Sequence, residues 1–422
     1  MLNEICRVSD GINDDFVGLR FTDDKAQNGF KKPEIIFPRG YRLSSEENNL
    51  RKDVLHLFLI LHKFTNINQG RTQNNIETEK VSFPILSYQY IIYDFLANGY
   101  YADKDVEYKK SQSGKINWQR TIQKVKPMVD NCNIIYLDYI TKKTINKSDV
   151  ITKIHEYCVY ESFSKLGWLY LKSAYTPRKP SLTINKNNEK RFIAIINDAF
   201  KNTFNNNKKM LFKNMIAIIK QANENSNFQN ELYGVNKFEY IWERLVDYTY
   251  GIDNKEEYFP HGSYDLLLDK GIREQINSAL EPDTIMKSNG KVFVLDSKYY
   301  KYGITLRAES LPPTSSIHKQ IIYGKYISKK MCSNKDSVFN AFILPYNSKS
   351  SDVFYKFVGV GKGDWIIYDA GTPNYNYVAV ILLDTKYLMD NYTRKNAREI
   401  DYMDKFIVDS IKYYRDLAER SK

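Results

Sequence analysis

The amino-acid sequence predicts an α/β fold, with a central mixed sheet flanked by helices in the C-terminal region and an α+β region before it. Three observations support this prediction. Apolar runs typical of buried strands alternate with segments of helical periodicity after residue 236. Two of those strands form a hairpin that carries an aspartate at each outer end. A stretch rich in Pro, Asn and Lys at 177–189 separates the two regions, which we assign as 1–175 and 176–422.

The N-terminal region is predicted to contain short strands and longer helices. Apolar side chains at helical spacing indicate the helices, and short β-branched runs indicate the strands. The expected strands are Glu34–Phe37 and Asn133–Thr141, and the expected helices are Leu50–Phe64, Ser87–Ala97 and Ser148–Tyr170.

The segment Gly114–Ile122 stands out between lysine-rich flanks. One interpretation is the start of a strand with a buried tryptophan. The other is an exposed site for a partner protein or a nucleic acid, formed by Lys115, Trp118 and Arg120, because aromatic and cationic side chains concentrate at binding surfaces. The residues alone leave both interpretations open.

The C-terminal region is predicted to alternate helices and strands. The hairpin with the two aspartates lies between the third and fourth helices, an order that suits a central sheet covered by helices. The expected helices are Phe192–Phe204, Met210–Ala222, Lys237–Tyr250, Ser316–Met331 and Ala397–Glu419, and the later strands are Phe339–Leu344, Tyr355–Val360, Trp365–Tyr368 and Tyr377–Leu383.

The hairpin carries the residues with the clearest chemistry. Asp283 follows a proline, Asn289-Gly290 is a typical two-residue turn, and the apolar run Val292–Leu295 leads into Asp296 and Lys298. Two carboxylates on a buried strand pair are unfavourable unless a cation neutralises them. Two carboxylates and an ammonium at one point suit Mg²⁺, for which Mn²⁺ can substitute, and hydrolysis of a phosphodiester. Asp283 and Asp296 are therefore predicted metal ligands, with Lys298 assisting the attacking water or the developing charge.

Neighbouring segments offer further site residues. On the preceding helix, Glu243 is the favoured additional metal ligand and catalytic acid, and Glu239, one turn earlier, is the second choice. The carbonyl oxygen of Ser297 is a further candidate metal ligand. Gln320 is the predicted catalytic-site residue of the following helix, where it and Tyr323 are expected to contact the DNA backbone or to brace the lysine.

The amino-acid composition limits the kinds of protein that this chain can be. The chain has 422 residues, a formal net charge of +12 and a pI near 9.1, so a polyanionic partner is expected. Its four cysteines are scattered without a CxxC pair, which argues against a disulfide framework or a zinc site. We expect a cytoplasmic protein without a membrane association, because neither a signal peptide nor an apolar run long enough to span a bilayer is present.

These motifs resemble those of known nucleases. The Pro-Asp and Asp-x-Lys elements are similar to the active-site pattern of the PD-(D/E)xK superfamily. The stretches Leu280–Asp283 and Val294–Tyr299, the helix with Gln320 and the strand that ends in Pro345 resemble McrC-type nuclease subunits. Gly114–Ile122 and the helix with Trp242 and Glu243 look more specifically like the LlaJI family of restriction endonucleases.

The resemblance implies a Mg²⁺-dependent endonuclease subunit of a phage-defence restriction system, which cuts double-stranded DNA and works with an McrB-like AAA+ GTPase. It also implies that 1–175 contacts the partner or DNA and that 176–422 cuts. The sequence contains no GxxxxGK[ST] motif, so we expect the nucleotide to be hydrolysed by another chain. Two alternatives stay open: a stand-alone site-specific type II enzyme, and a non-catalytic DNA- or partner-binding protein on a nuclease fold.

Overall fold

The chain forms two units, described here from a computed structural model. Unit 1 comprises Met1–Val81 and Gly234–Lys422, and unit 2 comprises Ser82–Tyr233. The predicted boundary at residue 175 lies inside unit 2, because the first 81 residues join the C-terminal elements. The structure describes residues 2–10, 15–23, 31–66, 83–130, 133–147, 150–171, 175–224, 232–268, 271–277, 279–331, 334–349 and 353–420.

Unit 1 is built on a five-stranded mixed sheet in the order β12-β13-β14-β16-β15. The three central strands run parallel to one another, and the two edge strands are antiparallel to their neighbours. Every residue of β14 and β16 is buried, as expected of strands covered on both faces. The strands are β12 (Thr284–Ser288), β13 (Lys291–Ser297), β14 (Val338–Tyr346), β15 (Tyr355–Gly361) and β16 (Val378–Asp384).

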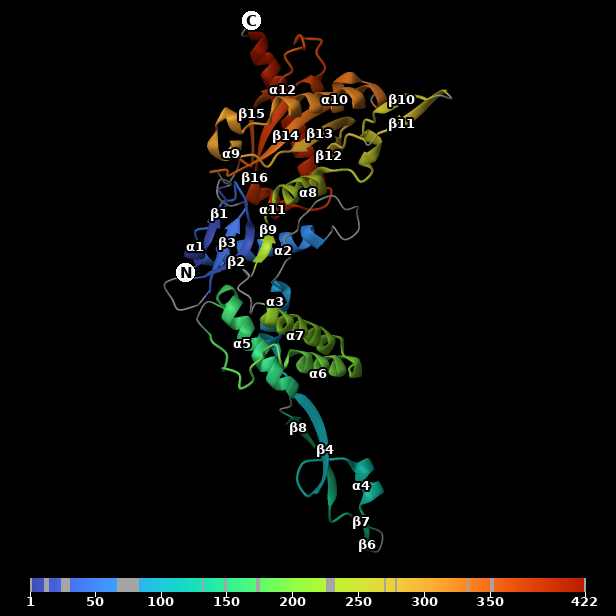
Figure 1. The fold of residues 1–422 in the computed structure, drawn as a ribbon. Coiled ribbons are helices and arrows are strands. Elements are labelled where there is room, and N and C mark those ends of the chain that lie inside the picture. Colours follow the sequence, from blue (N-terminus) through green and yellow to red (C-terminus); the bar gives the residue numbers. More distant parts are fainter. Residues whose placement is uncertain are drawn as a thin grey trace. The chain divides into compact units, whose positions relative to one another are not determined.

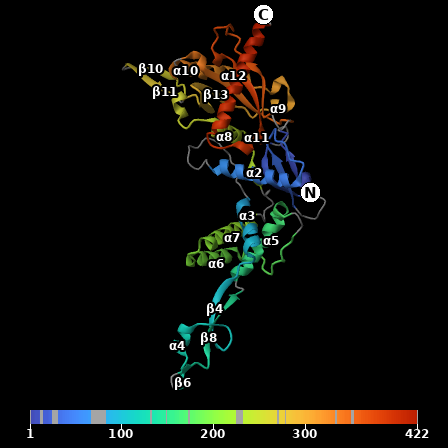
Figure 2. The same cartoon turned by 180° about the vertical axis from the view of Figure 1, so that it is seen from behind.

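Helices cover both faces of this sheet. In Figure 1, α10 (Thr314–Met331) lies on the near face, and the view from behind in Figure 2 shows α12 (Ala397–Arg420) in front. Ile321 of α10 packs in a buried cluster with Phe342 and Leu344 of β14. The other elements of this region are α8 (Glu239–Tyr250), η2 (Lys255–Tyr258), α9 (Tyr302–Thr305), η3 (Ala308–Ser310), η4 (Lys335–Ser337), η5 (Asn374–Asn376) and α11 (Thr385–Asn391).

A two-stranded ribbon, β10 (Ser263–Leu268) and β11 (Gly271–Ile276), stands apart from the five-stranded sheet. Figures 1 and 2 both show it projecting from the side of the unit that holds β12. All of its described side chains are exposed.

The N-terminal part of unit 1 forms a second sheet. Its strands are β1 (Cys6–Val8), β2 (Val17–Asp23) and β3 (Lys31–Phe37), with β9 (Leu232–Val235) next to β2. β1 is parallel to β3, and β2 is antiparallel to it. The associated helices are α1 (Leu2–Ile5) and α2 (Glu47–Asn66).

Unit 2 contains a group of helices and a long β arm. The helices are α3 (Ile85–Asn98), α5 (Val150–Tyr170), α6 (Glu189–Asn202) and α7 (Asn206–Glu224). The arm is formed by the antiparallel strands β4 (Asp103–Ser111) and β8 (Tyr139–Lys147), with the short β5 (Lys115–Ile116) beside β8. It also carries α4 (Trp118–Lys124) and the pair β6 (Met128–Asp130) and β7 (Asn133–Ile135).

Most predicted elements are confirmed within a few residues, including the hairpin and its turn. Asn289 and Gly290 both have positive φ, at 48° and 72°, as a two-residue hairpin turn of this type requires. The strand predicted at Trp365–Tyr368 is wrong. That segment forms a turn in which Ile366 N donates to Gly363 O. Gly and Asp residues, which favour turns, lie on both sides of it, at 363–364 and 369–371.

Two further differences concern β structure. The predicted strand Asn133–Thr141 is split between β7 and β8, and the ribbon β10–β11 was not predicted. The structure contains no helix, among its described residues, that is long and apolar enough to cross a membrane.

Candidate active site

The two predicted aspartates lie at one edge of the five-stranded sheet. Asp283 immediately precedes β12, and Asp296 is near the end of β13. The antiparallel register pairs Thr284 with Leu295, so the next pair outward is Asp283 and Asp296. Ser297 N donates a hydrogen bond of 2.9 Å to Asp283 Oδ2. The hairpin therefore brings the two carboxyl groups together across the strand pair.

Asp283 is held in an environment that opposes its ionisation. Burial is the main cause, and the Asp296 charge, a hydrogen bond to Asp296 and the Glu243 charge raise the pKa of Asp283 further. The hydrogen bond from Ser297 N acts in the opposite direction but is outweighed. Like charges opposite one another on a strand pair repel, so this pair favours a shared proton or a bound cation.

Lys298 provides the positive charge of the cluster. Its Nζ is 3.0 Å from Asp296 Oδ2, and the two side chains are only 23% and 15% exposed. Burial acts to lower the pKa of Lys298, but the Asp296 carboxylate outweighs it, so the pKa is raised above its ordinary value. Lys298 is therefore protonated at neutral pH and neutralises one of the two carboxylates.

Of the two glutamates on α8, Glu243 is the one that faces the cluster. Burial raises the pKa of Glu243 to about 7, and the charges of Lys298 and Asp296 act on it. Glu239 is exposed. The adjoining Trp242 is fully buried and its Nε1 donates to Ile343 O at 3.3 Å, which anchors the helix to the sheet.

Gln320 and Tyr323 on α10 are both buried. Gln320 Nε2 donates to Val294 O at 2.7 Å, and Tyr323 OH donates to Glu281 O at 3.1 Å. At 1% exposure, Gln320 is not placed to contact a DNA backbone, and its hydrogen bond braces β13, which ends one residue before Lys298, rather than the lysine itself. The acidic pair raises the pKa of the Tyr323 hydroxyl in addition to burial, which places Tyr323 beside the carboxylates.

Two groups that hold the site in place were not predicted from the sequence. Lys255 Nζ donates to the carbonyl of Asp283 and lies 3.0 Å from Asp247 Oδ1 on α8. On the other strand, Tyr299 receives a hydrogen bond at its hydroxyl from Arg39 N at 2.6 Å, while Arg39 Nη1 donates to Tyr299 O at 2.9 Å. The Arg39 guanidinium also lies over the Tyr299 ring, 4.9 Å from its centroid. Arg39 and Tyr299 are 260 residues apart in the sequence, so local sequence patterns could not predict this contact.

The donor set fits a hard divalent cation with few protein ligands. No group of three or more His, Cys, Asp or Glu side chains within the described ranges is close enough to enclose a metal ion. Two adjacent carboxylates that repel each other remain, and Mg²⁺ commonly binds through one or two carboxylates while keeping its waters. Glu243 acts on the pair electrostatically.

Comparison with known proteins identifies the family. The sequence model of the LlaJI restriction endonucleases matches residues 30–390. The chain belongs to the LlaJI restriction endonuclease family. Restriction endonucleases cut DNA, so the acidic cluster belongs to a member of a nuclease family.

Two individual proteins are similar to this LlaJI family member. The type II restriction enzyme BsuMI component YdjA of Bacillus subtilis (strain 168) is 23% identical over 387 residues, which are 88% of this chain and 80% of YdjA. A structure of McrB AAA+ hexamers with bound McrC from Thermococcus gammatolerans matches with 13% identity and a TM-score of 0.29, covering 96% of this chain and 83% of that chain.

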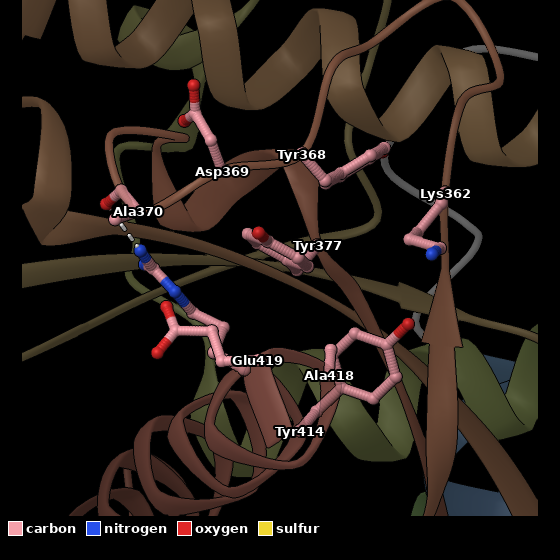
Figure 3. A pocket seen from close by; sticks show the side chains of 9 residues that line it. Lys362, Tyr368, Asp369, Ala370, Tyr377, Tyr414, Ala418 and Glu419 are labelled. Atoms are coloured by element: carbon pink, nitrogen blue, oxygen red, sulfur yellow. Dashed lines mark hydrogen bonds between the residues drawn. The ribbon is translucent and has the colours of Figure 1, made fainter. Parts of the chain in front are cut away.

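A small cavity of about 220 Å³ lies elsewhere in this LlaJI family member. Figure 3 shows Tyr377 and Tyr414 lining it, with Lys362 to one side. Arg415, which also lines it, donates to Ala370 O at 2.8 Å. Tyr377 precedes β16, whereas Asp296 is near the end of β13, which runs in the same direction, so the cavity and the aspartates are at opposite ends of the parallel strands. It is separate from the candidate active site.

The other candidate residues, Lys115, Trp118 and Arg120, lie on the β arm of unit 2. Trp118 begins α4 and is 53% exposed, so the interpretation as a buried strand residue is wrong. The Arg120 guanidinium stacks over Tyr108 at 3.7 Å, and Lys115 is exposed on β5.

Proposed function

We propose that this chain is the DNA-cutting component of a restriction system and that Asp283, Asp296 and Lys298 form a PD-(D/E)xK-type active site dependent on Mg²⁺. The observation that carries the proposal is the partly buried, mutually repelling aspartate pair, which the hairpin register places side by side, with a lysine 3.0 Å from one carboxylate. Membership of a restriction endonuclease family supports the reaction class.

In this proposal the carboxylates of Asp283 and Asp296 and the carbonyl of Ser297 hold the cation. Bound Mg²⁺ would polarise the scissile phosphate and lower the pKa of a bound water. Lys298, kept protonated by Asp296, stabilises the charge that builds on the phosphate oxygens. Glu243, with a pKa of about 7, is the group able to accept or hold a proton near the site at neutral pH.

The direct test compares the wild-type protein with Asp296→Asn and Lys298→Met in a plasmid nicking assay. We expect Mg²⁺-dependent cleavage that EDTA abolishes and Mn²⁺ restores, and a loss of at least about a hundredfold in each variant. Asp364→Asn and Lys325→Ala are matched controls, because both residues are exposed outside the acidic cluster. Full activity of Asp296→Asn would refute the assignment of the site.

We also propose that the enzyme works with a separate AAA+ GTPase. The motif resemblance to McrC-type subunits and the description of YdjA as a component both favour a multi-protein system. The β arm of unit 2 offers a surface for the partner, because its apolar side chains are unusually exposed. They include Trp118 53%, Ile122 61%, Val129 71%, Ile134 66% and Leu137 62%.

Co-purification with a co-expressed candidate AAA+ GTPase tests the partnership. Trp118→Ala together with Ile122→Ser should release the partner while nicking by a large excess of the chain alone is unchanged. Efficient, site-specific cleavage without partner or nucleotide would instead favour a stand-alone type II enzyme. Absence of cleavage under every condition would favour a non-catalytic protein.

A further inference from the structure

The β10–β11 ribbon projects from the nuclease unit close to the candidate active site. Its base is closed by Asn277 N donating to Gly262 O at 2.8 Å and by Leu280 N donating to Pro260 O at 2.9 Å. Only Glu281 and the buried Pro282 separate Leu280 from Asp283. The ribbon is therefore attached directly to the chain segment that supplies one proposed metal ligand.

The ribbon lacks a covering layer. Both faces are exposed, with Leu267 84%, Ile272 70%, Ile276 62% and Tyr264 61% accessible. A two-stranded hairpin without a covered face is marginally stable by itself. A segment of this kind close to a catalytic site suggests a binding element rather than a structural one.

The two faces of the ribbon differ in chemistry. The register pairs Tyr264 with Gln275 and Leu266 with Arg273, so these four side chains share one face. Arginine, glutamine and tyrosine are hydrogen-bonding types that read or contact DNA, with Arg favouring guanine and Gln favouring adenine. No hydrogen bond or ion pair links the Arg273 side chain to another residue in the described part of the chain, and Gln275 Nε2 makes a long contact of 3.4 Å to Ile276 O.

The opposite face carries the acids. Asp265 lies directly across from Glu274, flanked by the apolar pair Leu267 and Ile272. Two like charges facing each other weaken the ribbon and repel a polyanion. Charge is thus segregated, and only the Arg273 face is compatible with phosphates and base edges.

The dimensions suit a groove of DNA. Each strand has 6 residues, which corresponds to about 20 Å at roughly 3.3 Å per residue. The major groove is about 12 Å wide and about 8.5 Å deep and admits a two-stranded ribbon. The ribbon is therefore long enough to reach the base edges.

We infer that the β10–β11 ribbon enters the major groove beside the scissile phosphate, with Tyr264, Leu266, Arg273 and Gln275 towards the bases, and that it sets the sequence preference around the cut. This inference rests on the proposed function, because it takes DNA as the substrate of the adjoining site. It assigns Arg273 and Gln275 as specificity-determining residues rather than catalytic ones.

The binding test uses full-length protein that carries Asp296→Asn, so that DNA is bound and not cut. Fluorescence anisotropy measures its Kd, in EDTA at fixed salt, for the tightest-binding labelled duplex selected from a random-sequence pool. Adding Arg273→Ala and Gln275→Ala together should weaken binding about tenfold or more, since each good base contact is worth about 1–3 kcal/mol. The matched control is Asp265→Asn with Glu274→Gln on the opposite face, which should retain or tighten binding.

The cleavage test uses the same pairs of substitutions with Asp296 intact. Sequencing of the ends that the enzyme produces from plasmid DNA should show an altered base distribution for the Arg273 and Gln275 variant only. Unchanged Kd and unchanged ends would overturn the inference, as would equal effects of the two pairs. If the Arg273 and Gln275 variant binds DNA with an unchanged Kd but changes its oligomeric state or loses partner binding, the ribbon binds a protein and the inference is overturned.

The outcomes separate this inference from the proposed function. If wild-type protein fails to cut but the binding data respond as expected, the proposed catalysis fails and the ribbon assignment stands. If Mg²⁺-dependent cleavage is lost in Asp296→Asn while the ribbon variants bind and cut normally, the proposed function stands and the ribbon assignment fails.

Discussion

The Asp283 carboxyl group is destabilised in its ionised form by burial and by Asp296. Replacing it with Asn removes the repulsion and keeps an oxygen that can accept the hydrogen bond from Ser297 N. We expect Asp283→Asn to abolish Mg²⁺-dependent cleavage and, in EDTA, to stabilise the fold by on the order of 1 kcal/mol. Plasmid nicking and chemical denaturation measure the two effects.

A matched variant makes that result interpretable. Asp364→Asn removes a carboxylate from an exposed turn, so its stability and activity should stay close to wild type. If Asp283→Asn lowered the free energy of unfolding, the carboxylate would be a structural group and the predicted repulsion would be absent.

Glu243 gives the site a pH dependence. Its pKa is raised to about 7 in the folded protein, above the value of about 4.3 expected in the unfolded chain. A raised pKa of an acid contributes stability below the unfolded pKa, and this stability is lost as pH rises through the folded pKa. In EDTA we therefore expect the Tm to fall between about pH 5 and about pH 8. Glu243→Gln should flatten this dependence.

The affinity for Mg²⁺ is expected to change with pH in the opposite direction to the stability of the fold. A cation competes with protons for the carboxylates, so the apparent affinity for Mg²⁺ should rise with pH through the same range. Titration of Mg²⁺ in the nicking assay at several pH values measures it. An affinity independent of pH would show that Asp283 and Glu243 do not take part.

Among the elements, α10 has a direct structural link to β13. Gln320 on this helix satisfies the carbonyl of Val294, two residues before Asp296, from a fully buried position. Gln320→Leu leaves that carbonyl without its donor and should lower the free energy of unfolding by about 1–3 kcal/mol. Urea denaturation measures the loss.

The activity of the same variant decides whether α10 positions the site. We expect kcat to fall with little change in the affinity for DNA, because β13 carries Asp296 and Lys298 follows its last residue. Lys325→Ala, exposed on the same helix, is the matched control and should leave the free energy of unfolding near wild type. A variant that loses stability but keeps its full kcat would limit Gln320 to a structural role.

Elements defined by local chemistry could be predicted from the sequence. The Asn289-Gly290 turn fixes the hairpin, and the largely apolar runs of β14 and β16 identify buried strands. The strand prediction at Trp365–Tyr368 was wrong because aromatic and β-branched residues occur in exposed turns as well as in strands. The ribbon was missed because neither of its faces is buried, so its sequence lacks a clear alternation of apolar and polar residues.

For the whole molecule, the first 81 residues belong to the unit that holds the acidic cluster. Arg39 reaches Tyr299, and Thr385 Oγ1 donates to Arg39 O at 2.9 Å. A fragment containing only 176–422 lacks these contacts and should fail to unfold cooperatively, whereas the full chain should give a cooperative transition. Limited proteolysis and near-UV circular dichroism test this. A fragment that folds and cuts as well as the full chain would contradict it.

The sequence predicts the acidic and lysine residues of the candidate site, but not the residues that hold them in place. Asp283, Asp296 and Lys298 are close in sequence, so hairpin geometry alone brings them together. The sequence analysis favours Glu243 over Glu239, and the orientation of α8 adds a physical reason for that choice, because Glu239 is exposed. The contacts of Arg39 and Lys255 depend on tertiary packing, which single-sequence periodicity does not encode.

The strand order of the main sheet has a consequence for how the protein is made. β16 is the last strand in the sequence, yet it lies between β14 and β15. During synthesis β15 emerges without a neighbour, and the sheet behind the acidic cluster closes only after residue 384 leaves the ribosome. A nascent chain that stalls earlier lacks this central strand. We therefore expect chains truncated before β16 to leave the sheet behind the acidic cluster incomplete and to show no cutting activity.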